Sequence, residues 1–239
     1  MAFPSILRVD SEPPVKFQEA IRAQYPIYKE EQTTNIRFNF PTEAQAQNPL
    51  LLRGGNAYRF SSEDLNWTIS CTRDFIALST TQYTRWEDFK GHFQDPLSKF
   101  IKEYAPPFFT RVGLRYVDII NRHELGLDSE PWHELLSPYI AGELSYPEIA
   151  DHVLSCANQL IIGVGQSGAK ILLNHGLVSN KGNNPADFSY LIDCDFSTEQ
   201  KTEIADVYNR IDDFNGYSRR LFRWCIKDKV HDALHPQPL

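Results

Sequence analysis

Three short apolar segments between Tyr58 and Thr81 constrain the fold more than any other feature of this chain. They cover Tyr58–Ser61, Leu65–Thr72 and Phe75–Thr81, have the β-branched and aromatic content typical of strands, and are separated only by short polar runs. Parallel strands need a long crossover connection, whereas antiparallel strands can be joined by a tight turn. The sequence therefore predicts an antiparallel meander here.

Strand and helix patterns alternate along the rest of the chain. In residues 1–107 they predict, in order, a strand over Ser5–Val9, a helix over Pro14–Tyr25, four strands between Thr33 and Thr81, and a helix from Thr84 to Tyr104. In residues 108–239 they predict a long strand over Phe108–Asn121, a short helix over Trp132–Tyr139, strands over Glu148–Gly163, Ala169–Val178 and Phe188–Phe196, and two closing helices.

This order of elements predicts an α+β fold in which a curved antiparallel sheet packs on long helices, as in helix-grip and TBP-like folds. The first half, 1–107, has the order β-α-β4-α, and the second half, 108–239, has the order β-α-β3-αα. We therefore expect two pseudo-repeated halves that form one continuous structural unit.

Local signals predict how the helices begin and end. Thr84 and Glu87 have the spacing of a capping box, in which each side chain bonds the other residue's backbone N–H. Pro96 predicts a kink or a new start in the helix that follows. Ser197–Thr198 can cap the first of the closing helices, and Gly216 is expected to separate it from the second.

Composition narrows the class of protein. The net charge of −7 opposes binding to nucleic acid or to an anionic membrane unless a local basic patch is present. The four cysteines are far apart and form no C-x-x-C pair, which indicates buried free thiols in a reducing compartment. The sequence has no secretory signal pattern and no apolar run long enough to cross a bilayer, so we expect a cytoplasmic protein.

The hexamer from Arg111 to Tyr116 is the most distinctive candidate site. On a strand, Arg111, Gly113 and Arg115 share one face, and Val112, Leu114 and Tyr116 share the other. Two guanidinium groups around a glycine leave room for an anion or a partner carboxylate, so we take Arg111, Arg115 and Tyr116 as candidate ligand-binding residues. The alternative is that the arginines pair with acidic residues of a neighbouring strand or helix.

The same segment carries a resemblance to a known family. The run R-V-G-L-R-Y-V-D-I-I-N-R, together with Y-T-R-W-E-D-F at Tyr83–Phe89 and L-I-D-C-D-F at Leu191–Phe196, resembles a sporadically distributed prokaryotic family that has no assigned activity. The resemblance covers nearly the whole chain. It implies a bacterial or archaeal cytosolic context and supplies no mechanism.

Asp193 and Asp195 are the candidate metal ligands. They lie two residues apart on one face of a predicted strand, so that two carboxylates could share a divalent cation. With Arg115 as an anion clamp, they would suit a metal-dependent phosphoester hydrolase. The alternative is that acids at the end of a strand serve as partners for the helix that follows.

Two further motifs have simpler explanations. His231 and His235 have the i, i+4 spacing of a zinc-binding helix, but Pro236 follows at once, which favours a solvated helix end. Gly163–Gly168 contains G-x-G-x-x-G, but the segment after it has strand composition, which favours a hairpin turn over a nucleotide site.

The sequence therefore favours a non-enzymatic binding or interaction protein that recognises an anionic ligand or an acidic protein surface. It predicts no cofactor, no nucleic acid and no membrane as partners, and it does not predict the oligomeric state. The metal-dependent hydrolase with Asp193 and Asp195 is the alternative.

Overall fold

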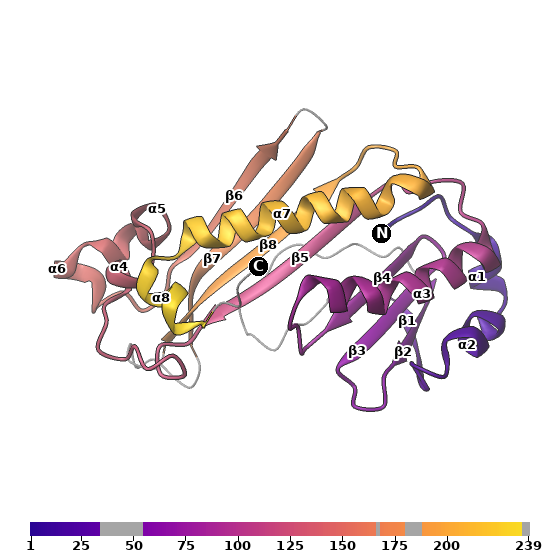
Figure 1. Cartoon of the computed structure of the whole chain (residues 1–239), viewed down its shortest axis with the longest axis horizontal. Coiled ribbons are helices and arrows are strands. Elements are labelled where there is room, and N and C mark those ends of the chain that lie inside the picture. The colour runs from indigo at the N-terminus through magenta and orange to yellow at the C-terminus, as the bar shows by residue number, and fades with distance from the viewer. Residues whose placement is uncertain (34–54, 166–167, 180–187, 236–239) are drawn as a thin grey trace. The chain divides into compact units, whose positions relative to one another are not determined.

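Helices and antiparallel strands make up both parts of the chain, which confirms the α+β class. The computed structural model describes residues 1–33, 55–165, 168–179 and 188–235 (Figure 1). Within them, the chain divides into a first compact unit of residues 1–33, 55–112 and 199–208, and a second unit formed by the remaining residues. Among the described helices, none is both long and apolar enough to cross a membrane.

The first unit is built on a sheet whose four strands follow one another in chain order. Its strands are β1 (Ile27–Thr33), β2 (Gly55–Ser61), β3 (Trp67–Thr72) and β4 (Phe75–Thr80), and its helices are α1 (Leu7–Ser11), α2 (Val15–Ile21) and α3 (Trp86–Tyr104). Each strand pairs antiparallel with the next, so the predicted meander is confirmed. The pairing is direct because Trp67–Thr72 and Phe75–Thr80 are separated by only a two-residue turn.

Aromatic rings from α2, α3 and the sheet fill the core of this unit. The Phe17 ring of α2 meets Phe60 of β2 at 5.7 Å and Phe100 of α3 at 5.6 Å between centroids, edge to face in both cases. All three side chains are buried. Edge-to-face packing adds to the free energy gained from burying the rings, so this contact ties both helices to the sheet.

Helix α3 runs without a break through Pro96, which corrects the prediction of a restart. Proline has no N–H and therefore leaves the carbonyl of the residue four positions earlier without its helical partner. Here that residue is His92, and the hydroxyl of Tyr25 donates to its carbonyl oxygen at 3.1 Å. The Tyr25 side chain thus supplies the hydrogen bond that the proline cannot donate. Pro96 is buried and lies within a continuous helix.

Three other predictions for this unit need correction or fall outside it. Ser5–Val9 was expected as a strand, but Leu7–Ser11 forms α1, whose Val9 is buried. Thr84 does not cap α3, since its hydroxyl donates to the Asp88 side chain at 3.1 Å and Arg85 takes the N-cap position. The predicted strand Thr33–Phe40 lies outside the described residues except for Thr33, which ends β1.

The second unit holds a sheet with the strand order β5-β8-β7-β6. Its strands are β5 (Val112–Ile120, the first residue of which belongs to the first unit), β6 (Ala157–Val164), β7 (Ala169–Ser179) and β8 (Phe188–Thr198). The helices are α4 (Trp132–Leu135), α5 (Pro138–Ala141), α6 (Pro147–Ala150), α7 (Val207–Cys225, mostly in this unit) and α8 (Asp228–Ala233). A short 3₁₀ turn at Gly142–Ser145 joins α5 to α6.

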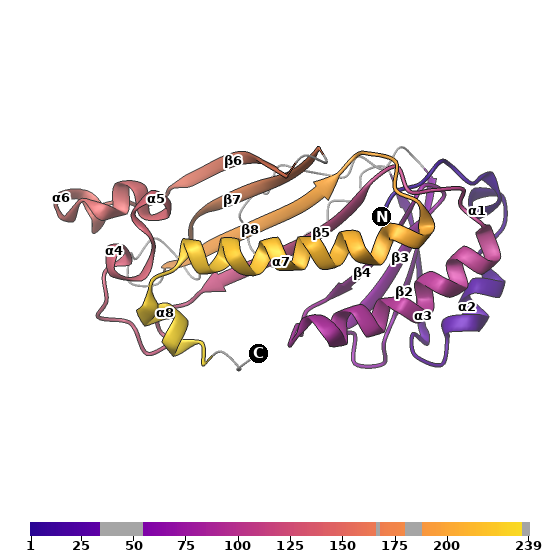
Figure 2. The same cartoon turned by 45° about the horizontal axis from the view of Figure 1, so that its top comes forward.

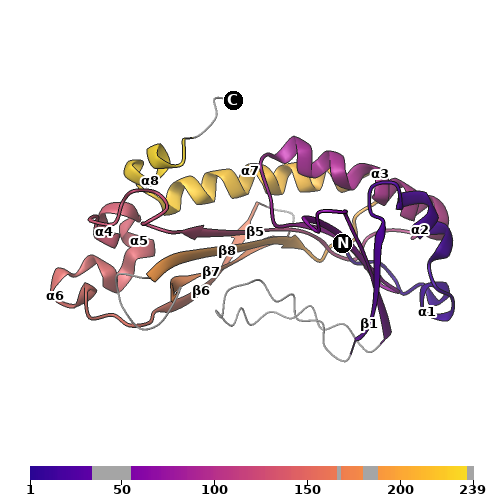
Figure 3. The ribbon, with the colours of Figure 1, turned by 90° about the horizontal axis from the view of Figure 1, so that it is seen from below.

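Strand β8 lies in the interior of this sheet and is its most buried strand. Only Asp195 among its eleven residues is more than slightly exposed. It pairs with β7 over ten positions, from Lys170 with Ser197 to Ser179 with Phe188. Helix α7 runs along one face of the sheet (Figure 2 and Figure 3), and the Tyr116 hydroxyl of β5 donates to Asn215 of that helix at 3.0 Å.

Several boundaries in this unit differ from prediction. Gly216 does not separate two helices, because α7 continues through it. A glycine inside a helix lowers helix stability by about 1 kcal/mol, and the burial of Ile211 and Phe214 on the same helix offsets this loss. Ser197–Thr198 belongs to β8 and caps no helix. Residues 132–139 form parts of two helices rather than one.

The segment Glu148–Gly163 was predicted as one strand and is a helix end, a loop and part of β6. Gly163–Gly168 joins β6 to β7, with Val164 opposite Ala169, so its interpretation as a hairpin connection is confirmed for the described residues.

Candidate functional site

Arg115 makes a two-pronged ion pair with Asp193 on the neighbouring strand β8. Its Nε donates to Oδ1 at 2.7 Å and its Nη2 donates to Oδ2 at 2.6 Å. The Asp193 side chain is 2% exposed and that of Arg115 is 27% exposed. Such a fork is strong and geometrically specific, so Asp193 already occupies the anion-binding edge of this guanidinium group. This is the structural alternative to an open anion site at Arg115.

The other two candidate residues of the hexamer lie in different surroundings. Arg111 belongs to the first unit, where its backbone N–H donates to Ala2 at 3.3 Å and its carbonyl accepts from Ala2 at 2.8 Å. Tyr116 is adjacent to Arg115 and therefore points to the opposite face of the sheet, where it bonds to Asn215. Within the second unit, Arg115 and Tyr116 thus do not line one site.

A row of polar side chains crosses the sheet on the face of Arg115. Asn174 on β7 is the register partner of Asp193, and Gln159 on β6 is the register partner of Asn174. The Gln159 amide donates to Asn174 Oδ1 at 2.7 Å. The row joins all four strands, and nothing in the local sequence around Gln159 or Asn174 could have placed them beside Asp193, because register between strands is a long-range property.

Asp193 and Asp195 share a face, as their spacing predicted, but only Asp193 is deeply buried. Both oxygens of Asp193 accept hydrogen bonds from Arg115, which leaves the carboxylate poorly available to a cation. In the part of the chain that the structure describes, no three His, Cys, Asp or Glu side chains gather closely enough to hold a metal ion.

The face of the sheet beneath α7 contains several titratable groups whose pKa burial raises. Burial raises the pKa of Asp118 to about 6, with a smaller contribution from the charge of Asp193. Burial raises the pKa of the Cys225 thiol to about 12 and also raises that of Cys194. A thiol needs a lowered pKa to act as a nucleophile at neutral pH, so these cysteines are suited to packing.

His175 belongs to the core as well. Its Nδ1 lies 2.7 Å from the hydroxyl of Tyr190, which donates to the Ile140 carbonyl at 2.7 Å. Burial lowers the pKa of His175. The ring is therefore neutral. It is part of a buried hydrogen-bonded chain, and the role of this chain is structural.

The exposed end of α7 presents a different set of side chains, which we call the basic–aromatic surface. It consists of Tyr139, Arg219, Arg220, Arg223 and Trp224, all of them exposed. The Tyr139 ring from α5 stacks on Trp224 at 6.0 Å with 9° between the ring planes, although the two side chains remain 79% and 45% exposed. Large aromatic groups that stack on each other in solvent are typical of contact surfaces.

The arginines of this surface differ in how they are held. Within the described residues, Arg219 and Arg220 make no ion pair, whereas Arg223 pairs with Asp228. The Arg220 guanidinium carbon lies 5.0 Å from the ring centroid of Tyr217, one turn earlier on the same helical face. Two guanidinium groups therefore remain available for acidic groups from outside.

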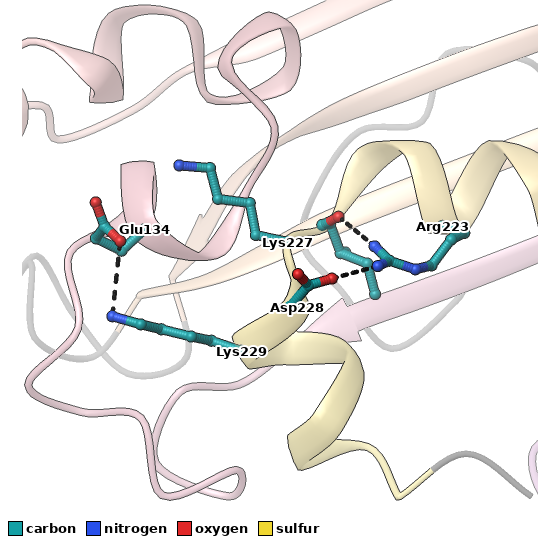
Figure 4. A pocket seen from close by; sticks show the side chains of 6 residues that line it. Glu134, Arg223, Lys227, Asp228 and Lys229 are labelled. Carbon is teal, nitrogen blue, oxygen red and sulfur yellow. Dashed lines mark hydrogen bonds and ion pairs between the residues drawn. The ribbon is translucent and has the colours of Figure 1, made fainter.

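A depression of about 420 Å³ lies next to this surface, between α4 and α8 (Figure 4). Its cations are already paired: Arg223 with Asp228, and Lys229 with Glu130 at 2.6 Å and Glu134 at 3.6 Å. Lys227 extends to the backbone carbonyl of His133 at 2.6 Å. The depression is thus an ion-pair network that fixes α8 to α4, and the unpaired charge lies beside it, on α7.

Comparison of the chain with models of protein families, with curated proteins and with solved structures gave no significant match. The prokaryotic family resemblance therefore stays a prediction. The apolar stripe of α7 predicts a helix but does not reveal the basic–aromatic surface, which sequence reasoning missed. Three arginines within five positions of an acidic chain were the signal that could have revealed it.

Proposed function

We propose that this protein is a non-enzymatic binding module that recognises an acidic protein surface through its basic–aromatic surface. The observation that carries the proposal is the pair Arg219 and Arg220, exposed and without ion pairs among the described residues, beside the exposed Tyr139–Trp224 stack.

Charge distribution supports this choice of partner. From Tyr217 to Lys227 the chain contains four basic residues and no acidic one, although the whole chain has a net charge of −7. A local positive field attracts an acidic partner to this one place, and the acidic remainder of the protein repels the partner elsewhere. This is the local basic patch that the overall composition requires for binding any anion.

The aromatic pair supports a protein partner over a small anion. Tryptophan, tyrosine and arginine are enriched among the residues that contribute most to binding at protein interfaces. The stack is open to solvent rather than enclosed in a cavity, as a 79% exposed Tyr139 shows. Because Tyr139 and Trp224 already hold each other in place, and Tyr217 holds Arg220, little side-chain entropy is lost on binding.

Three finer expectations belong to the same proposal. The protein acts in the cytoplasm of a prokaryote, and it arose from two pseudo-repeated halves of helix-grip type. The repeat is supported by α3 and α7, which are each 19 residues long and each follow the last strand of a four-stranded antiparallel sheet.

The test measures binding of a fluorescent glutamate-rich peptide by anisotropy at several salt concentrations. The double variant Arg219→Glu/Arg220→Glu is expected to bind at least about 30-fold more weakly, and Trp224→Ala at least about 10-fold more weakly, as for residues central to an interface. Added salt should weaken binding by the wild type.

The matched control is Lys16→Glu/Arg22→Glu, which makes the same change in net charge on exposed positions of the first unit. It should bind nearly as well as the wild type. Equal losses of affinity in the two double variants would mean that binding depends only on the total charge of the protein. Full binding by Arg219→Glu/Arg220→Glu would show that the basic–aromatic surface does not bind the peptide.

A further inference from the structure

Strand β6 is an exposed edge strand that lacks the usual protection against pairing. It is the outermost strand of its sheet (Figure 1 and Figure 2) and pairs with β7 at all eight of its positions. Its sequence, A-N-Q-L-I-I-G-V, contains no charged residue and no proline. Natural sheets guard such edges with charges, prolines or bulges, because a free edge is a template for another strand.

The other strands at the ends of the two sheets are guarded. β1 carries Lys29, Glu30 and Glu31, and β5 carries Arg115 and Asp118. β4 has no charge, but its Ile76 exchanges backbone hydrogen bonds with Met1, with distances of 2.9 and 2.8 Å. Among the described strands that end a sheet, β6 alone combines a neutral sequence with an outer edge that makes no backbone hydrogen bond to another described residue.

The side chains of β6 are apolar on both of its faces. Ile161 is 72% exposed and Leu160, on the opposite face, is 43% exposed. With Ile162 and Val164 they form an apolar and mostly β-branched segment of the kind that pairs readily when it meets a second strand. Exposure of this segment in an isolated chain costs free energy that pairing would recover.

The backbone groups that face outward can be identified from the ladder to β7. The Leu177 N–H donates to the carbonyl of Cys156, one residue before β6, at 3.0 Å. Residues of an antiparallel strand bond alternately to one side and the other, so the even-numbered residues of β6 bond to β7. The N–H and C=O groups of Gln159, Ile161 and Gly163 therefore point away from the sheet.

We infer that β6 pairs antiparallel with β6 of a second copy of this chain, so that two sheets join into one across a two-fold axis. Ile161 then lies opposite Ile161 of the second copy, and Gln159 of each copy lies opposite Gly163 of the other. In an antiparallel ladder each of these three residue pairs exchanges two backbone hydrogen bonds, which gives six. The axis keeps each face of the sheet continuous, so Leu160 contacts Ile162 of the second copy.

Charge selects a second copy as the occupant. Antiparallel self-pairing sets the central residue of a strand against the same residue of the second copy, so a charged central residue such as Glu30 of β1 would face a like charge, whereas Ile161 of β6 faces another isoleucine. Two copies of an acidic chain repel each other generally, and the neutral β6 is where they can approach. This inference is independent of the basic–aromatic surface.

Sedimentation velocity over a range of protein concentrations tests the inference. The wild type is expected to change from the 27.5 kDa monomer to a dimer as concentration rises. Ile161→Lys places two ammonium groups opposite each other and should raise the dimer dissociation constant more than about 10-fold. Gln159→Lys is a second variant on the same edge and should act in the same direction.

The matched control is Leu65→Lys, which replaces a 57% exposed leucine in the first unit with the same side chain. It should dimerise like the wild type. A wild type that stays monomeric at every concentration would overturn the inference, and so would a dimer that both edge variants leave unchanged. Hydrogen exchange gives an independent reading, because the amides of Gln159, Ile161 and Gly163 should become protected only when the dimer forms.

Discussion

Replacing Arg115 with methionine should destabilise the second unit strongly. The substitution keeps an unbranched side chain but removes both charge-assisted bonds to Asp193, which are 2.7 and 2.6 Å long. The carboxylate of Asp193, 2% exposed, would then be buried without its partner. Removing one member of a buried ion pair costs about 3–5 kcal/mol, and we expect a loss of that size in the free energy of unfolding.

The assay is urea unfolding, combined with hydrogen exchange of the β8 amides, which reports the opening of this sheet separately from the first unit. Arg85→Met is the control, since Arg85 and Asp88 form an ion pair with side chains that are 70% and 41% exposed. Exposed pairs contribute about 0–1 kcal/mol, so the control should change stability little.

A second substitution separates the loss of the ion pair from the burial of an unpaired charge. In the double variant Arg115→Met/Asp193→Leu, no charge remains buried, and most of the lost stability should return. The reasoning would be refuted if Arg115→Met cost less than about 1 kcal/mol, or if the double variant were no more stable than the single one. Binding of the acidic peptide should be unchanged in both folded variants, because Arg115 is not part of the basic–aromatic surface.

The remaining predictions concern other buried groups of the second unit. Burial raises the pKa of Asp118 from 3.8 to about 6, so the contribution of this group to stability is full below about pH 4 and is lost as the pH rises through 6. The variant Asp118→Asn should therefore stabilise the protein by about 1–3 kcal/mol at pH 7.5 and change its stability little at pH 4. Urea unfolding at both pH values measures the two effects. Equal effects at the two pH values would contradict this. Gly176→Ala should destabilise by at least about 1–3 kcal/mol in thermal unfolding, since its new methyl group would lie 2.0 Å from the Cys156 carbonyl oxygen; an unchanged melting temperature would count against it. Tyr190→Phe should cost about 1–3 kcal/mol because its buried hydroxyl donates to the Ile140 carbonyl at 2.7 Å, and a neutral effect would show that this bond adds nothing.

The elements predicted best from sequence are those whose signal is local. The strands β2, β3 and β4 follow from apolar segments joined by very short turns, and β7 and β8 follow from long segments rich in apolar residues. Helix α3 follows from an apolar stripe at helical spacing. In each case the residues that decide the structure lie within a few positions of one another, so the physical rule can be applied without knowing the fold.

The elements predicted poorly depend on distant contacts. Strand β1 has three charged residues and no clear alternation, and it is a strand because all seven of its residues pair with β2. Pro96 does not break α3 because Tyr25, far away in the sequence, bonds to the carbonyl that the proline leaves free. Gly216 does not end α7, because the helix is held by packing on both sides of it.

The candidate site shows the same division. The sequence by itself determined that Arg115 and Asp193 lie on strands, and that each shares a face with the residues two positions away, because side-chain direction follows from the strand period. Only the tertiary structure decided that these two side chains face each other, that Asn174 and Gln159 extend the row, and that Trp224 meets Tyr139 at the surface. Strand order, register and helix packing are set by the summed contacts of the whole unit, so no local pattern can specify them.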